Sequence, residues 1–158
     1  MVEHFDILGL GCTAVDDLLY VENYPAADTK APIRRQERQG GGLTGTALVA
    51  AARMGARCQY AGSLGGDELS RFVKQRFQEE GVGLDYLSSL SGFQEVAKSA
   101  ATLREAAPSG RKPPGITQPH LDRRDDPRPV HSIIIVDESR QTRTIFFDSD
   151  GAGRARVD

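Results

Sequence analysis

A cluster of glycines that leads directly into a short apolar segment constrains this chain more than any other feature. Gly40, Gly41 and Gly42 precede residues 43–54, and Gly55 follows them. Glycine lets a ligand approach the main chain closely, and the first N–H groups of a helix have no partner within the helix. Such groups can bind hydroxyl groups or anions. The cluster therefore predicts a small-molecule site at the start of a helix.

Short apolar segments bounded by glycine or by turn-forming residues predict the strands of the chain. Residues 33–39 could form a further strand, and the short apolar segments are residues 5–11, 15–21, 58–64, 131–136 and 142–147. A turn at residues 137–140 separates the last two, which therefore predict a hairpin. The segment 33–39 is charged and contains no long apolar run, as expected for an edge strand.

Two segments have apolar residues at helical spacing. The first has Thr44 or Thr46 as its predicted N-cap and ends at Gly55, and the second begins after Asp67 and ends at Gly81. The apolar face of the second consists of Leu69, Phe72, Val73 and Phe77. Because strands and helices alternate along the chain, the sequence predicts an α/β fold.

Residues 89–128 differ in composition from the rest of the chain. Six of the eight prolines lie between Pro108 and Pro129, among charged residues and glycines. A connection of this length within a compact domain is usually a lid, a linker or a disordered segment, and we favour disorder. The sequence thus predicts three parts: residues 1–88, a disordered insertion over 89–128, and residues 129–158 with the hairpin and a short tail that looks cut off.

Charge and composition exclude several classes of function. The net charge of −2 comes from interspersed acidic and basic residues, without the basic stripe of a nucleic-acid-binding protein. Neither a basic leader nor an apolar run of membrane length is present, so we expect a soluble, cytoplasmic protein. Cys12, Cys58 and the three histidines match no metal-binding or redox spacing, and we expect buried, reduced thiols and no metal site.

Two further glycine motifs give only weak support to other functions. Residues 9–14 match the loose G-x-G-x-x-A form of a dinucleotide-binding turn, which would indicate an NAD-dependent oxidoreductase. That turn requires a helix next, whereas residues 15–21 favour a strand. Residues 148–153 combine acids with Gly151 and Gly153, but no helix follows, and we interpret them as part of a frayed tail.

An acidic pair follows the first predicted strand. A carboxylate near a glycine loop can accept hydrogen bonds from two neighbouring hydroxyl groups. We predict this role for Asp16, and we interpret Asp17 as a solvated turn residue.

The strand at residues 5–11, Asp16, the glycine cluster and the Gly-Ser-Leu-Gly-Gly-Asp run at 62–67 follow an order that resembles the ribokinase or PfkB family of carbohydrate kinases. The resemblance covers residues 4–87 and 129–148. It implies an incomplete ribokinase-like fold, with the N-terminal part of a mostly parallel sheet, helices and a small β-sheet lid. In several members this lid also forms the dimer contact, so a dimer through the lid strands is a further expectation.

The resemblance also assigns the site residues. It implies that Asp16 holds sugar hydroxyl groups and that Gly41 and Gly42 approach the sugar through their backbone. Thr46 stands where the family has Asn, and its single hydroxyl replaces the fork of an amide. The expected partner is therefore a small-molecule sugar, with no nucleic acid and no membrane.

Complete family members use ATP and Mg²⁺, and the Asp of a Gly-Ala-Gly-Asp motif is their catalytic base. Arg154 follows the Gly-Ala-Gly run at residues 151–153, where that base would stand. The resemblance implies ATP-dependent phosphorylation of a sugar hydroxyl in the complete protein, with this chain carrying only the sugar-binding half, no catalytic residue and no nucleotide site. The alternative is a non-catalytic fragment that binds sugar or pairs through its lid with a full-length kinase.

Overall fold

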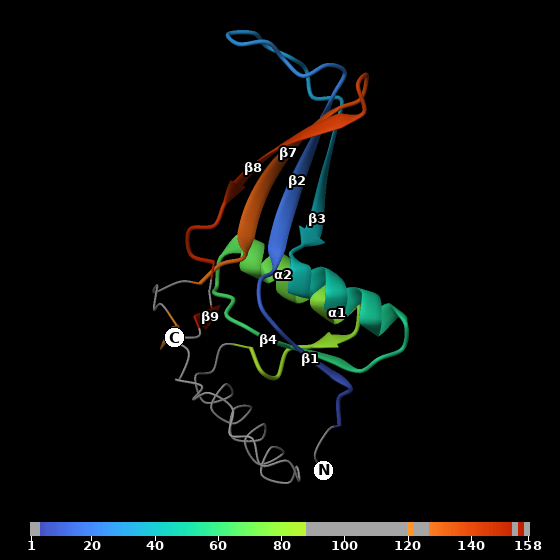
Figure 1. Cartoon of the computed structure of the whole chain (residues 1–158), viewed down its shortest axis with the longest axis vertical. Coiled ribbons are helices and arrows are strands. Elements are labelled where there is room, and N and C mark those ends of the chain that lie inside the picture. Colours follow the sequence, from blue (N-terminus) through green and yellow to red (C-terminus); the bar gives the residue numbers. More distant parts are fainter. Residues whose placement is uncertain (1–3, 88–119, 122–126, 153–154, 157–158) are drawn as a thin grey trace, which may run out of the picture.

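The computed structural model describes residues 4–87, 120–121, 127–152 and 155–156 (Figure 1). Most of the predicted insertion at residues 89–128 lies outside the described residues. The division of the chain into three parts therefore stays a prediction.

Both predicted helices and all six predicted strands are present, with ends that differ by a few residues. The described residues also form three strands of two residues each that were not predicted, at residues 82–83, 120–121 and 155–156. The strands are β1 (Ile7–Leu10), β2 (Ala14–Val21), β3 (Arg35–Gly41), β4 (Cys58–Ala61), β5 (Val82–Gly83), β6 (His120–Leu121), β7 (Val130–Asp137), β8 (Thr142–Asp148) and β9 (Ala155–Arg156). The helices are α1 (Leu43–Arg53) and α2 (Glu68–Glu79).

A parallel sheet in the order β1-β4-β5, here called the body sheet, carries both helices. Its core contains side chains from both helices and from β4, together with the start of β2. The buried members include Val15, Leu48, Tyr60, Val73 and Phe77. The predicted apolar face of α2 is confirmed, because Val73 and Phe77 are buried and Leu69 and Phe72 pack against them.

A second sheet in the order β3-β2-β7-β8, here called the lid sheet, extends away from the helices (Figure 1). The β2–β7 pair is parallel, and the β2–β3 and β7–β8 pairs are antiparallel, which confirms the hairpin. Within the part of the chain that the structure describes, β8 has a neighbour on one side only, and every residue of it is exposed. The lid sheet thus joins strands from both ends of the chain.

The two helices begin in different ways. Asp67 is the N-cap of α2, as predicted, and its carboxylate accepts a hydrogen bond of 3.0 Å from the backbone N–H of Ser70. The predicted Thr44 or Thr46 cap of α1 is wrong, because Gly42 occupies that position without a side-chain hydrogen bond. Its φ of 84°, favourable for glycine, lets the chain turn into the helix directly after the last strand residue.

The described helices are each too short or too polar to span a membrane.

Candidate functional site

The four predicted site residues all lie where the lid sheet meets the start of α1. Asp16 is in β2, Gly41 is the last residue of β3, Gly42 caps α1, and Thr46 lies in its first turn. The antiparallel register pairs Ala14 with Gly41 and places Asp16 two residues further along β2 on the same face. The fold therefore brings these residues to one junction, and their role in binding stays a prediction.

Asp16 and Gly41 are in direct contact. A side-chain carbon added at residue 41 would lie 2.5 Å from Oδ2 of Asp16, which is closer than such atoms approach in proteins. Only glycine at this position lets the Asp16 carboxylate remain where it is. The carboxylate and a bare stretch of backbone thus share one surface.

Gly42 has a structural reason to be glycine. Besides its positive φ, a side-chain carbon there would lie 2.7 Å from the backbone of Thr13. The start of α1 therefore packs directly on the chain that enters β2. The predicted contact of Gly42 with a sugar is a separate property, and it stays a prediction.

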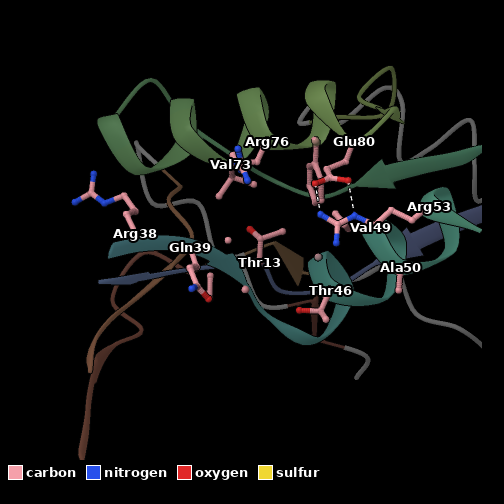
Figure 2. A pocket seen from close by; sticks show the side chains of 15 residues that line it. Thr13, Arg38, Gln39, Thr46, Val49, Ala50, Arg53, Val73, Arg76 and Glu80 are labelled. Carbon is pink, nitrogen blue, oxygen red and sulfur yellow. Dashed lines mark hydrogen bonds and ion pairs between the residues drawn. The ribbon is translucent and has the colours of Figure 1, made fainter. Parts of the chain in front are cut away.

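A cavity of about 460 Å³ lies between α1, α2 and the free edge of β3 (Figure 2). Gly41 and Thr46 line it, whereas Asp16 and Gly42 do not. Figure 2 shows Thr13 at its centre and the Arg53–Glu80 ion pair closing one end, with Nε of Arg53 2.7 Å from Oε2 of Glu80. The predicted residues thus lie on two sides of the start of α1: Asp16 on the sheet face, and Thr46 on the cavity.

Sequence reasoning missed the α2 residues of this cavity. Arg76 and Phe77 of α2, and Glu80 directly after it, line the wall opposite Thr46, some 30 positions away in the chain. No local pattern marks them, because the wall exists only once the two helices have packed together.

The interpretation of Asp17 as a solvated turn residue is wrong. Asp17 lies within β2 and is 8% exposed. Its carboxylate accepts hydrogen bonds from Arg38, Nε to Oδ1 at 2.6 Å and Nη2 to Oδ2 at 2.9 Å, and Nε2 of His131 lies 2.8 Å from Oδ2. The hydrogen bond from Arg38 is the largest influence on the pKa of Asp17, which lies below its usual value although burial acts to raise it.

The glycine motif at residues 9–14 does not form a dinucleotide-binding turn. The strand β2 follows it where that turn needs a helix, and the hydroxyl of Tyr60 donates a hydrogen bond of 3.0 Å to the carbonyl of Gly11. The motif therefore gives no support to an oxidoreductase.

The cysteines differ in their surroundings. Cys58 is buried as predicted, and burial raises the pKa of its thiol, but Cys12 is exposed because it lies in the turn between β1 and β2. Among the described residues, no three histidine, cysteine or acidic side chains gather in a way that could hold a metal ion.

Comparison with known proteins shows similarity to carbohydrate and nucleoside kinases. The family model described as pfkB family carbohydrate kinase matches residues 6–105. The chain is 33% identical over 98 residues to the bifunctional ribokinase/ribose-5-phosphate isomerase A of Fructilactobacillus sanfranciscensis, covering 61% of this chain and 18% of that protein. It is 25% identical over 85 residues to the nucleoside kinase of Methanothermobacter thermautotrophicus, covering 54% and 28%.

Among solved structures, Arabidopsis thaliana ribokinase complexed with ribose and ATP matches with a TM-score of 0.60 at 13% identity. The match covers 96% of this chain and 37% of that one. The predicted ribokinase-like fold is thereby confirmed, and the chain spans less than a third of the length of the curated relatives named above.

Proposed function

This chain belongs to the pfkB family of carbohydrate kinases, and from that membership we propose that its lid–helix junction binds the sugar or sugar-like hydroxyl compound that a complete kinase phosphorylates with ATP. The contact between Asp16 and Gly41 carries the proposal. A carboxylate can accept hydrogen bonds from two neighbouring hydroxyl groups, and the adjacent glycine leaves room for a ring to lie against the backbone.

Positioning is the main contribution that these residues would make to phosphoryl transfer. The transferred group needs an acceptor oxygen held in line, and little covalent chemistry is required of the protein. In this proposal Asp16 fixes the orientation of the sugar, and Gly41 and Gly42 bring the backbone close to it. Thr46 offers one hydroxyl from the cavity side of α1.

ATP and Mg²⁺ have no assigned residues in this proposal. No three histidine, cysteine or acidic side chains of the described residues gather in a way that could hold a metal ion. We place the nucleotide, the metal and the catalytic base in the part of the family fold that this chain does not span. The proposal includes a cytoplasmic location, in keeping with the free thiols of Cys12 and Cys58.

Calorimetric titration of the chain with ribose and with fructose tests the proposal. We expect binding by the unaltered chain and its loss in Asp16→Ala, because the variant removes the hydroxyl acceptor. Glu138→Ala removes an exposed carboxylate in the β7–β8 turn and is the matched control, with affinity unchanged. Equal affinity in Asp16→Ala, or binding of neither sugar by the unaltered chain, would contradict the proposal.

A second role, pairing through the lid, is favoured by the outer strand of the lid sheet. Ile145, Phe146 and Phe147 of β8 are 47%, 53% and 72% exposed. An open strand edge that carries large apolar side chains readily pairs with another chain. We propose that β8 joins the lid sheet of a second copy of this chain or of a full-length kinase.

A further inference from the structure

Each strand of the lid sheet contributes one ionisable side chain to a single row near the helices. In the order of the strands β3-β2-β7-β8, these residues are Arg38, Asp17, His131 and Asp148. Asp17 pairs with Arg38 across one ladder, and His131 pairs with Asp148 across another. Asp17 also pairs with Ile133, two residues from His131, so all four side chains lie on one face.

The row continues beyond both edges of the lid sheet. At the β3 edge, Nη1 of Arg38 donates to the carboxylate of Glu68, the first residue of α2, and the guanidinium lies 6.0 Å from the ring of Phe72. At the β8 edge, Nη2 of Arg128 lies 2.6 Å from Oδ2 of Asp148. The six residues, here called the charged row, alternate acidic with basic or titratable side chains from α2 to the segment before β7.

The middle of the charged row is more buried than its ends. The side chains of Asp17, His131 and Arg38 are 12%, 27% and 32% exposed, and that of Glu68 is 71% exposed. A buried carboxylate needs its partners, because loss of one leaves a charge without compensation. Such a group is satisfied in one register of the strands and not in a register shifted by one residue.

Asp16 directly precedes Asp17 and therefore projects from the opposite face of β2. From this placement we infer that the charged row positions Asp16: it fixes β2 between β3 and β7 and holds the lid sheet on α2, which makes Arg38 and His131 positioning residues of the sugar site. The role of Asp16 in sugar binding rests on the proposed function. The inference that the charged row fixes β2 and the Asp16 side chain is independent of that function.

The test compares Arg38→Met with Arg35→Met in the 158-residue chain. Both arginines lie in β3, but Arg35 contacts Tyr20 and Glu37 and takes no part in the charged row. The first readout is the ¹³C resonance of the Asp16 carboxylate, together with hydrogen exchange of the β2 amides. We expect Arg38→Met to shift the resonance and speed exchange, and Arg35→Met to do neither.

Substitutions at His131 separate positioning from general stability. His131→Gln keeps a donor for Asp17, whereas His131→Val removes it. We expect the ¹³C resonance of the Asp16 carboxylate to stay at its position in the glutamine variant and to shift in the valine variant. Glu68→Ala removes only the exposed contact of Arg38 with α2. This variant keeps the test valid if Arg38→Met does not fold, and it too should shift the resonance.

Ribose titration is the second readout, and we expect Arg38→Met to weaken affinity about tenfold or more through misplacement of Asp16. An unchanged Asp16 resonance in Glu68→Ala and in every other substitution at a charged-row residue that folds, except His131→Gln, would overturn the inference, whatever happens to ribose binding. If the resonance shifts but the unaltered chain binds no ribose, the proposed function fails and the positioning of Asp16 stands.

Discussion

Three adjacent glycines at the junction of lid and helix have three different environments. A side-chain carbon at Gly40 would meet nothing within 4 Å, one at Gly41 would meet the carboxylate of Asp16, and one at Gly42 would meet the backbone of Thr13. A carboxylate can rotate away, whereas backbone cannot. Substitution by alanine should therefore have no effect at Gly40, weaken ligand binding at Gly41 and impair folding at Gly42.

We predict that Gly41→Ala weakens ribose binding about tenfold, because the new methyl group displaces the hydroxyl acceptor. Gly40→Ala is the matched control and should bind normally. Gly42→Ala should lower the free energy of unfolding by about 2 kcal/mol or more through strain and overlap. Calorimetry and urea denaturation measure the two effects, and normal affinity in Gly41→Ala would argue against the Asp16 site.

At the scale of secondary structure, the two helices show how a cap residue is chosen. The carboxylate of Asp67 accepts a hydrogen bond from the backbone N–H of Ser70, three residues later. Such a cap can be predicted from the local sequence. The cap of α1 cannot be predicted in this way. Gly42 precedes two threonines that are good caps in isolation, but packing on Thr13 fixes the helix start earlier.

We predict that Asp67→Ala lowers the free energy of unfolding by about 1 kcal/mol at neutral pH. Burial acts to raise the pKa of Asp67, but hydrogen bonds from Ser70 hold it below the usual value of 3.8. The contribution of Asp67 is therefore full above that value and is lost as the pH falls through the lower pKa of the folded state.

Denaturant titrations at neutral pH and at about pH 2 should show the difference between the two chains shrinking in acid. Thr46→Ala is the control, since Thr46 does not cap α1, and its stability should match that of the unaltered chain at both values. A pH-independent loss in Asp67→Ala would mean that the carboxylate is not the stabilising group.

Local patterns predicted both helices and the long strands, because periodicity and bounding glycines are properties of short segments. The three two-residue strands were missed, since they are too short to carry a pattern. Asp17 was misjudged for a different reason: its partners Arg38 and His131 are 21 and 114 positions away. The grouping of Asp16 with Gly41 came from a family resemblance, and only the register of β2 and β3 shows their contact.

At the scale of the whole molecule, the lid sheet ends in an unprotected strand. β8 pairs only with β7 among the described residues, and its aromatic side chains face solvent on both sides of the sheet. Natural edge strands usually carry charges or are covered. This edge therefore supports association of the molecule with a second lid.

We predict that the chain is dimeric at micromolar concentrations and that Phe147→Lys makes it monomeric, as measured by size-exclusion chromatography with light scattering. Phe147 is 72% exposed, so the substitution should not disturb folding. Met54→Lys is the matched control, because Met54 is 88% exposed but follows α1, outside the lid sheet. A monomeric unaltered chain, or a dimeric Phe147→Lys variant, would exclude pairing of two copies of this chain through β8.

The parallel pairing of β2 with β7 has a consequence for how the chain acquires its structure. His131 and Asp17, which meet in that pairing, are 114 positions apart. Closing so long a loop adds little to the equilibrium cost, since each doubling of loop length costs about 0.6 kcal/mol, but distant pairings slow folding. During synthesis the body sheet and its helices can assemble first. Until β7 emerges from the ribosome, β2 and β3 can form only a two-stranded ribbon, which is marginally stable.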